Sequence, residues 1–305
     1  MTTEIRIDAS SDSGAPARAP RNGEGTRRRR RRSRLGSIAR HAIMIFAALI
    51  MIYPLLWLVV ASVRSPEEVL RPGLALTSFD LSNYSDGWSA LIRPFDSYLW
   101  NSFVLVFGSI LGNLFSCSLA AYAFARLEFR GKGWMFAAML MTIMVPIHVI
   151  IVPQYIFFSN FDLVNTFVPL LLPKFLAADS FFVFLMVQFI RGIPRDLDEA
   201  ARIDGAGHAR IFFQVILPLM VPALAATAIF TFIWTWNDFF SALIFLTDPD
   251  VQTVPVALRS FLDVTGESSF GPMFAMSLVS LLPVFIVFLI GQRYLVKGIA
   301  TTGLK

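Results

Sequence analysis

Six long apolar runs dominate the sequence and limit what it can fold into. They cover residues of about 42–63, 101–125, 134–157, 166–190, 215–237 and 272–292. A helix needs ~20 mostly apolar residues to cross the hydrocarbon core of a bilayer, and each run is about that long. Only 15% of the residues are charged, against about a quarter in soluble domains. The sequence therefore predicts an all-α membrane protein with six transmembrane helices.

Prolines lie inside or beside several of these runs: Pro54, Pro146, Pro153, Pro169, Pro173 and Pro283. Membrane helices tolerate proline where neighbouring helices or cavities satisfy the freed carbonyl groups. Kinks of this kind leave room between helices, which suits a transport path, but they also occur in purely structural spans. The fifth run stays apolar to Leu246, so we expect its outer end to break near Trp236–Asn237–Asp238 and restart.

The N-terminal 40 residues differ from the rest, because they are rich in Ser, Pro, Gly and Arg and include the run Arg27 to Arg32. They can bury too little apolar surface to offset ordering, so residues 1–40 are predicted to be a disordered basic tail. The arginines could contact anionic lipid headgroups or simply hold this end in the cytosol; the second is favoured. Ala42 to Val63 exceeds the ~7–15 apolar residues of a signal peptide and is interpreted as an uncleaved first span.

Basic residues are distributed unequally between the connections that separate the runs. Most lie on the side that holds both ends of the chain and the 191–214 loop: Arg126, Arg130, Lys132, Arg191, Arg195, Arg202, Arg210, Arg293, Lys297 and Lys305. The other side holds only Arg64, Arg71, Arg93 and Arg259, along with the acids Glu67, Glu68, Asp80, Asp86 and Asp96. Cytosolic loops carry the excess of Lys and Arg, so both termini are predicted to be cytosolic in a multi-pass protein.

A long polar segment separates the fourth and fifth runs. A short helix is expected from about Leu197 to Ile203, capped by Asp196 with Glu199 reaching back, and stopped by Gly205 and Gly207. Four residues fall at helical spacing on one stripe: Leu197, Ala200, Ala201 and Asp204. Such a helix could receive a push from a soluble protein, or it could be an ordinary capped cytosolic connection.

Several other classes of site find little support in the sequence. Cys117 is the only cysteine, which excludes an intrachain disulfide and a thiolate metal cluster; its serine neighbours predict a small packing residue. His41, His148 and His208 are too scattered to predict a metal site. No catalytic triad or carboxylate pair can be recognised, so an enzyme is not predicted. The formal charge of +5 does not predict nucleic-acid binding, because the basic residues cluster at the ends of apolar runs.

The polar loop carries a family resemblance. Glu199-Ala200-Ala201, Gly205, Val215 and Leu217-Pro218 resemble the EAA loop of ABC importer permeases, with Val215 in place of the usual Ile. Asp204-Gly205-Ala206 and the pair Pro218 and Pro222 resemble the carbohydrate branch. Further blocks agree in order: Asn101-Ser102, residues 120–127, Pro146 and Pro153, Trp236-Asn237-Asp238, Gln292-Arg293-Tyr294 and Lys297-Gly298. The resemblance covers about residues 42–305 and is closest to the maltose-type permease with six spans; only the ending, residues 301–305, departs from the usual pattern.

This resemblance implies a transmembrane permease domain over residues 41–305, with an ABC importer type-1 core at about 97–292. The loop would be a coupling helix that docks in a groove of a separate ATPase. Glu199 would pair with a basic residue of that ATPase, Ala200 and Ala201 would pack in the groove, and Asp204 and Gly205 would shape the turn. The chain has no Gly-x-x-x-x-Gly-Lys-Ser/Thr motif, so ATP with Mg²⁺ is expected on the partner.

The implied partners are a second homologous permease subunit, an ATPase dimer, an extracellular or periplasmic substrate-binding protein and the lipid of a bacterial or archaeal inner membrane. The binding protein would face the outer loops, about 64–100 and 247–270. Candidates for the transport path are Asn113, His148, Gln188, Trp236, Asn237 and Asp238. An ionisable residue such as His148 inside a membrane is a functional candidate, although it could also be a hydrogen-bonded packing residue. Trp234 and Trp236 could stack on a sugar or anchor the chain at the membrane interface.

The sequence thus favours a permease subunit of a binding-protein-dependent ABC importer for a sugar or oligosaccharide. The same type of importer for another solute, such as a polyamine, phosphate or an amino acid, remains open. A secondary transporter is less favoured, because the spans offer few ionisable groups besides His148 and Lys174.

Overall fold

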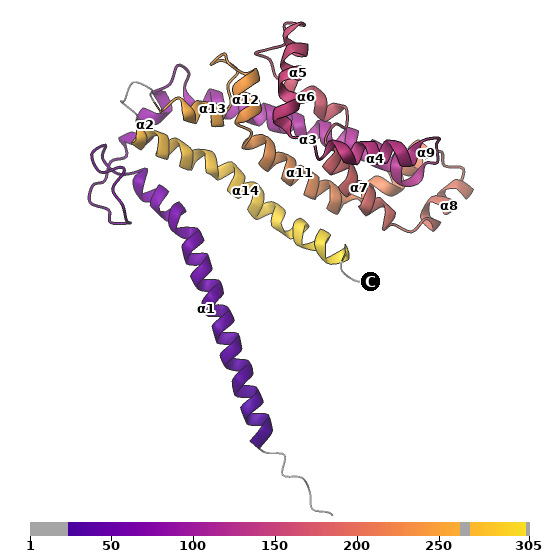
Figure 1. The fold of residues 1–305 in the computed structure, drawn as a ribbon, viewed down its shortest axis with the longest axis horizontal. Helices are drawn as coiled ribbons and strands as arrows, with labels where there is room; N and C mark the ends of the chain where they lie inside the picture. The colour runs from indigo at the N-terminus through magenta and orange to yellow at the C-terminus, as the bar shows by residue number, and fades with distance from the viewer. Residues whose placement is uncertain (1–23, 263–268, 303–305) are drawn as a thin grey trace, which may run out of the picture. The chain divides into compact units, whose positions relative to one another are not determined.

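The computed structural model describes residues 24–262 and 269–302, and within these ranges the protein is entirely helical, without strands (Figure 1). The chain divides into two units, one up to Leu55 and one from Leu56 onward. The first helix, α1 (Glu24–Ala61), belongs to both units, and all other helices belong to the second. The predicted all-α class is confirmed.

Among the residues that the structure describes, four segments are long and apolar enough to cross a membrane. They are Ser37–Ala61 of α1, α3 (Phe95–Arg126), Val168–Arg191 and Phe270–Arg293 of α14 (Phe270–Thr302). The third of these consists of α6 (Val168–Phe175) and α7 (Ser180–Arg191), joined through Ala177 at φ +53°. Two strongly bent helix pairs bring the number of candidate spans to six if each pair is one span.

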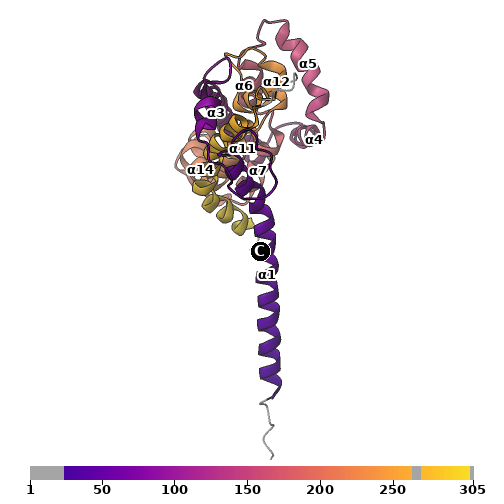
Figure 2. The ribbon, with the colours of Figure 1, turned by 90° about the vertical axis from the view of Figure 1, so that its left-hand side faces the viewer.

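Both bent pairs occupy apolar runs that were predicted to be single spans, and proline explains each break. In the third run, α4 (Lys132–Thr142) and α5 (Ile147–Ser159) differ in direction by 99°. Figure 2 shows the two helices running in different directions. Pro146 precedes α5 in an extended conformation. A proline lacks the N–H that would continue the helix, and it disfavours helical backbone in the residue before it.

The fifth run bends by 74° at Met220, between His208–Leu219 and α11 (Val221–Trp236). Its first part comprises α9 (His208–Ile211), the π-helical turn η1 (Phe212–Ile216) and α10 (Leu217–Leu219). Pro218 and Pro222 begin α10 and α11, positions at which a helix needs no N–H donor. After Trp236 the chain restarts as α12 (Phe240–Phe245), so the predicted break at residues 236–238 is confirmed.

Helix α1 corrects part of the prediction for the N-terminal tail. Residues 24–40, which were expected to be disordered, are helical. Arginine is a good helix former, and adding turns to an existing apolar helix avoids the cost of nucleation. The remainder of the predicted tail, residues 1–23, lies outside the described residues.

Helix α3 is the centre of the second unit, where it packs against α6, α7, α11 and the short α13 (Val254–Arg259). One apolar cluster joins α3 to α7 and to the chain around η1, and it includes Cys117, which is completely buried as a small packing residue. A second cluster joins α3 to α11, α13 and α14, and a third joins α5 to α12. Because α3 takes part in two of the three clusters, it connects the two ends of the unit.

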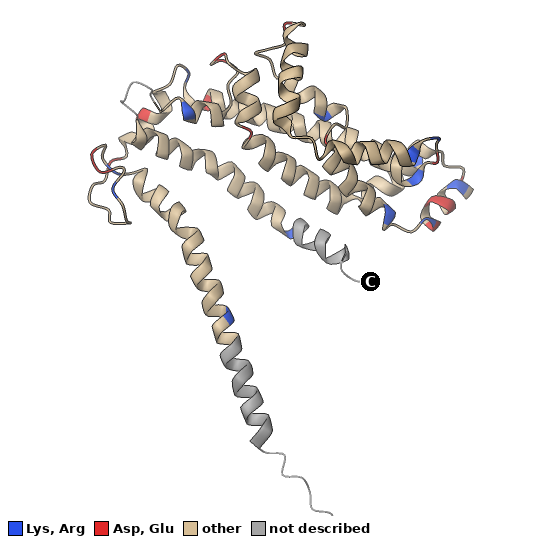
Figure 3. Cartoon of the chain, in the orientation of Figure 1, with Lys and Arg blue, Asp and Glu red and all other residues tan. Residues whose placement is uncertain are grey.

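Charged residues of the second unit gather at its two ends, and the middle of the helices holds few of them (Figure 3). At the end near α2 (Ser82–Ser89), Arg64 is buried and donates to the carbonyl oxygens of Arg71, Gly73 and Ala75. At the same end Arg93 Nε lies 2.5 Å from Asp250 Oδ1, and this hydrogen bond lowers the pKa of the Asp250 carboxyl. The opposite end holds the polar loop.

Candidate functional site

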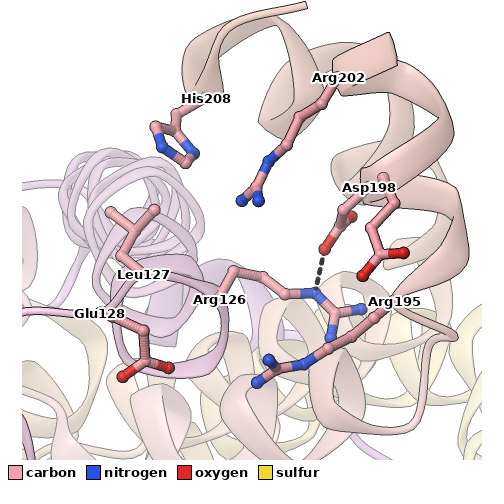
Figure 4. A pocket seen from close by; sticks show the side chains of 8 residues that line it. Arg126, Leu127, Glu128, Arg195, Asp198, Arg202 and His208 are labelled. Atoms are coloured by element: carbon pink, nitrogen blue, oxygen red, sulfur yellow. Dashed lines mark ion pairs between the residues drawn. The ribbon is translucent and has the colours of Figure 1, made fainter.

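The polar loop folds into the short helix α8 (Asp196–Ile203), which a buried ion pair ties to the end of α3. Arg126 is the last residue of α3, and its Nε lies 2.8 Å from Asp198 Oδ2, with both side chains almost fully buried (Figure 4). Arg126 Nη2 also donates to the carbonyl oxygen of Ile193, at 2.7 Å. One guanidinium thus holds the loop at two points, before the helix and within its first turn.

The C-terminal end of α8 is a Schellman motif centred on Gly205. The Gly205 N–H donates to the carbonyl of Arg202 at 3.0 Å, and the Ala206 N–H donates to that of Ala201 at 2.9 Å. Gly205 has φ +78°, a conformation that a residue with a Cβ adopts only with strain. The predicted sharp turn at Gly205 is therefore confirmed.

The predicted N-terminal cap of α8 is wrong. Arg195, not Asp196, precedes the helix, and no side-chain hydrogen bond caps it. In this turn it is Asp198 that points into the protein, where its carboxylate pairs with Arg126. Asp196, Asp198 and Glu199 all lie in the first turn, where negative charge favours the positive end of the helix dipole.

The four residues that were predicted to share one face of α8 do not share one environment. Leu197, Ala200 and Asp204 are exposed, whereas Ala201 is half-buried and packs against the apolar cluster of α3 and α7. Glu199 is exposed beside them, and Ile203 is 86% exposed. The free face of α8 therefore presents an acid, a small residue and two large apolar side chains to solvent.

A pocket of about 470 Å³ opens between α8 and the end of α3 (Figure 4). Side chains of both charge types line it: Arg126, Arg195, Arg202 and His208 together with Glu128, Asp198 and Glu199. Only the Arg126–Asp198 pair among them is buried. Glu128, which is exposed, pairs with Lys132 at 3.1 Å.

A second polar site lies within the spans, around an ion pair between Lys174 and Asp179. Lys174 Nζ lies 2.9 Å from Asp179 Oδ2, and Asn113 Nδ2 donates to the same oxygen at 2.7 Å. Asn113 is completely buried and also donates to Thr231 Oγ1 at 3.1 Å. This network links α3, α11 and the break between α6 and α7.

The six candidates for the transport path do not converge in the structure. Asp238 lines a cavity of about 290 Å³ together with Lys174 and Asp179, and Asn113 touches this site through Asp179. Trp236 instead packs in the core, where its Nε1 donates to the carbonyl of Ser280. The other three are exposed elsewhere: Asn237 donates to its own helix, His148 lies on α5 beside Phe240, and Gln188 lies on α7.

Comparison with known proteins decides the family. A family described as the inner membrane component of binding-protein-dependent transport systems matches residues 112–301. The chain belongs to this family. It is therefore a permease, a multi-pass membrane subunit of a transport system, and the prediction of a transport subunit rather than an enzyme is confirmed.

Relatives of this permease carry carbohydrate names. The arabinooligosaccharide transport permease AraQ of Halalkalibacterium halodurans is 34% identical over 85% of this chain and 93% of its own. The trehalose/maltose transport permease MalG of Thermococcus litoralis is 34% identical over 86% of this chain and 94% of its own. A solved bacterial ABC transporter that imports the acidic polysaccharide alginate shares the fold, with a TM-score of 0.76 and 24% identity over 87% of this chain and 98% of that one.

Sequence reasoning missed most of the residues that line the cavity of the permease. Lys174 was recognised as an ionisable residue in a span, but Asp179, five residues later in the same run, was not connected with it. That spacing would have been a usable signal, because two opposite charges in one apolar run need a common partner or a cavity. Ser109 and Gln154 gave no signal, since they come from other helices.

Proposed function

We propose that this permease forms one half of the membrane path of an ATP-driven importer for a sugar or oligosaccharide. The observation that carries the proposal is the exposed helix α8, which the buried Arg126–Asp198 pair ties to the central helix α3. Because its inner face is fixed to α3 and its outer face is exposed, α8 is suited to bind a soluble partner and to transmit that partner's movement to α3. The names of the relatives, which include arabinooligosaccharide and trehalose/maltose permeases, favour carbohydrate.

The coupling proposal assigns roles to the exposed residues of the loop. Glu199 pairs with a basic residue of the ATPase, Ala200 packs in its groove, and Asp204 and Gly205 shape the turn. Ala201 contributes from the inner side, since it is half-buried against the core. A ligand-driven switch requires contacts that differ between two states, and closure of the ATPase dimer on ATP and Mg²⁺ would change the contacts at this helix.

The proposed assembly places α8 and both termini in the cytosol. The excess of Lys and Arg at the α8 end supports this orientation. The opposite end, with its acidic loops at residues 64–100 and 247–270, then faces a substrate-binding protein outside. A second, homologous permease completes the path, because one copy of this chain leaves large apolar side chains exposed along α5, α11 and α14.

A reconstituted transporter tests this proposal. The permease, its partner permease, the ATPase and the binding protein would be placed in liposomes with radiolabelled maltose, trehalose, diacetylchitobiose or arabinooligosaccharides. We expect uptake that requires ATP and persists when an ionophore removes the proton gradient. Uptake that persists without ATP and stops with the gradient would identify a secondary transporter instead.

The coupling role is tested with Glu199→Lys, which reverses the charge on the free face of α8. We expect ATP hydrolysis to continue and sugar uptake to fall by at least ~10-fold, the effect of losing roughly 1.4 kcal/mol of differential contact. Glu67→Lys is the contrasting control, since Glu67 is exposed in the loop proposed to face the binding protein, and this change should leave the number of sugars imported per ATP as in the unchanged protein. Equal uptake by both variants and the unchanged protein would contradict the coupling assignment.

A further inference from the structure

The cavity around Lys174 and Asp179 has features of a ligand site that the coupling function does not require. It holds about 290 Å³ and is enclosed by residues of α3, α5, α6, α11 and α12. Its polar lining comes from Ser109, Gln154, Lys174, Asp179, Thr235, Asp238 and Ser241, and Trp234 forms part of its wall. Ligand pockets of proteins hold ~300–1,000 Å³, so this cavity suits a small solute or one unit of a longer chain.

Charged side chains inside a span are costly and are found mainly where they face a cavity or a partner. Here the ammonium of Lys174 contacts both carboxylate oxygens of Asp179, at 3.2 and 2.9 Å. Both side chains remain slightly more than one quarter exposed. An ion pair with a purely structural role would be sealed by packing, as Arg126 and Asp198 are, whereas this pair keeps free hydrogen-bonding capacity toward the cavity.

Ser109 supplies an independent observation. Its side chain is completely buried on α3, it lines the cavity, and its hydroxyl has no hydrogen-bond partner among the described residues. Leaving a buried hydroxyl unpaired costs about 1–3 kcal/mol. The chain could avoid that cost with alanine at this position, so the hydroxyl is best explained by a partner that comes from outside the protein.

The charge of the lining selects among solutes. The lining holds one cation, Lys174, and the two carboxylates of Asp179 and Asp238, which disfavours an anionic solute. Hydroxyl groups both donate and accept, and they therefore suit a lining that mixes an ammonium, carboxylates, an amide and a serine. The Trp234 ring, which lies tilted against the rings of Phe181 and Phe182, adds an apolar surface of the kind that a sugar ring can cover.

We propose that this cavity is the part of the transport path in which this permease binds a neutral polyhydroxylated solute. The proposal rests on the proposed sugar import. The Lys174–Asp179 pair and Ser109 contact solute hydroxyls, while Trp234 packs against the ring. Asn113 is a positioning residue, because it holds Asp179 and does not itself line the cavity.

The first experiment compares Ser109→Ala with Ser118→Ala in the reconstituted transporter. Ser118 is buried on the same helix, but its hydroxyl already donates to the carbonyl of Phe115, and it does not line the cavity. At saturating liganded binding protein, we expect Ser109→Ala to lower the number of sugars imported per ATP by ~2–10-fold, the effect of one hydrogen bond. The Ser118→Ala transporter should match the unchanged protein.

The second experiment detects solute in the cavity directly. Gln154→Cys is introduced together with Cys117→Ser, and the rate of maleimide labelling of the complete transporter is followed with and without the transported sugar. We expect sugar to slow labelling of Gln154→Cys. The control is Asn160→Cys, which is exposed directly after the end of α5, and sugar should leave its labelling rate unchanged.

The outcomes separate this inference from the proposed function. If the unchanged transporter imports sugar, yet the sugar does not protect Gln154→Cys or Ser109→Ala imports as efficiently as Ser118→Ala, the cavity is not a solute site and the inference fails alone. If the unchanged transporter imports none of the sugars with ATP, the proposed function fails. Protection by glycerol 3-phosphate but not by sugar would also overturn the inference, because it would require an anionic solute.

Discussion

At the scale of single residues, the Arg126–Asp198 pair has the largest energetic consequence. Burying two charges gains little net stability, because desolvation offsets most of their attraction. Removing only one partner is different, since it leaves a buried charge without compensation and costs about 3–5 kcal/mol. The pair therefore acts as a constraint on where α8 lies rather than as a large source of stability.

This constraint predicts a specific pattern in a double-mutant cycle. Asp198→Leu and Arg126→Met should each destabilise the permease by about 3–5 kcal/mol, and the double variant by clearly less than the sum. Thermal unfolding in detergent measures the stability, and hydrogen exchange over residues 193–206 measures the order of the loop. Strictly additive effects would show that the two side chains do not interact.

The residue scale also shows how far the sequence could predict the site. Local signals worked: the polar segment and the glycine predicted a short helix and its sharp end, because both depend on neighbouring residues. The inward turn of Asp198 was not predictable, since its partner ends a different helix. For the same reason the lining of the cavity was missed at Ser109 and Gln154, which only the packing of α3, α5 and α6 brings near Lys174.

At the scale of elements, α3 and α6 approach each other more closely than side chains normally allow. A Cβ at Gly112 would lie 2.9 Å from Phe175 Cδ2 and 3.0 Å from the carbonyl carbon of Lys174. The second contact is with backbone, so a side chain at position 112 can be accommodated only if α6 moves. That movement would displace Lys174 and disturb its pairing with Asp179.

We therefore predict that Gly112→Ala destabilises the permease and reduces sugar uptake. Overpacking of this kind costs about 1–3 kcal/mol. Gly133→Ala is the matched control, because Gly133 is also helical but a Cβ there meets no atom within 4 Å, and alanine favours a helix by up to about 1 kcal/mol. The measurement is thermal unfolding of the two variants. Equal unfolding temperatures for Gly112→Ala and Gly133→Ala would contradict the prediction.

At the scale of elements, bends were also harder to predict than spans. Hydrophobic length located the runs that form the four candidate spans and the two bent pairs, because polar residues separate one run from the next. The 99° and 74° bends depend on how Pro146, Pro218 and Pro222 sit against neighbouring helices. A proline predicts a possible break, but packing determines its angle.

At the scale of the whole molecule, the unequal distribution of charge predicts sidedness. In a Cys117→Ser background, Ser85→Cys on α2 should react with a membrane-impermeant maleimide applied to spheroplasts. Ala209→Cys on α9 should react only after the membrane is permeabilised, because it lies at the basic end with α8. Labelling of Ala209→Cys in sealed spheroplasts would reverse the proposed orientation.

Helix α3 extends between the two ends of its unit and also lines the cavity between them. Arg126 at one end binds α8, Ser109 lines the cavity, and Asn101 at the other end donates to the carbonyl oxygens of Asp250 and Gln252. Its 32 residues span ~48 Å. A tilt of ~5° about one end of such a rod moves the other end by ~4 Å. If the ATPase rotated α3 slightly at the α8 end, the other end of the helix would therefore move, on the far side of the membrane, by about the distance between two atoms in contact.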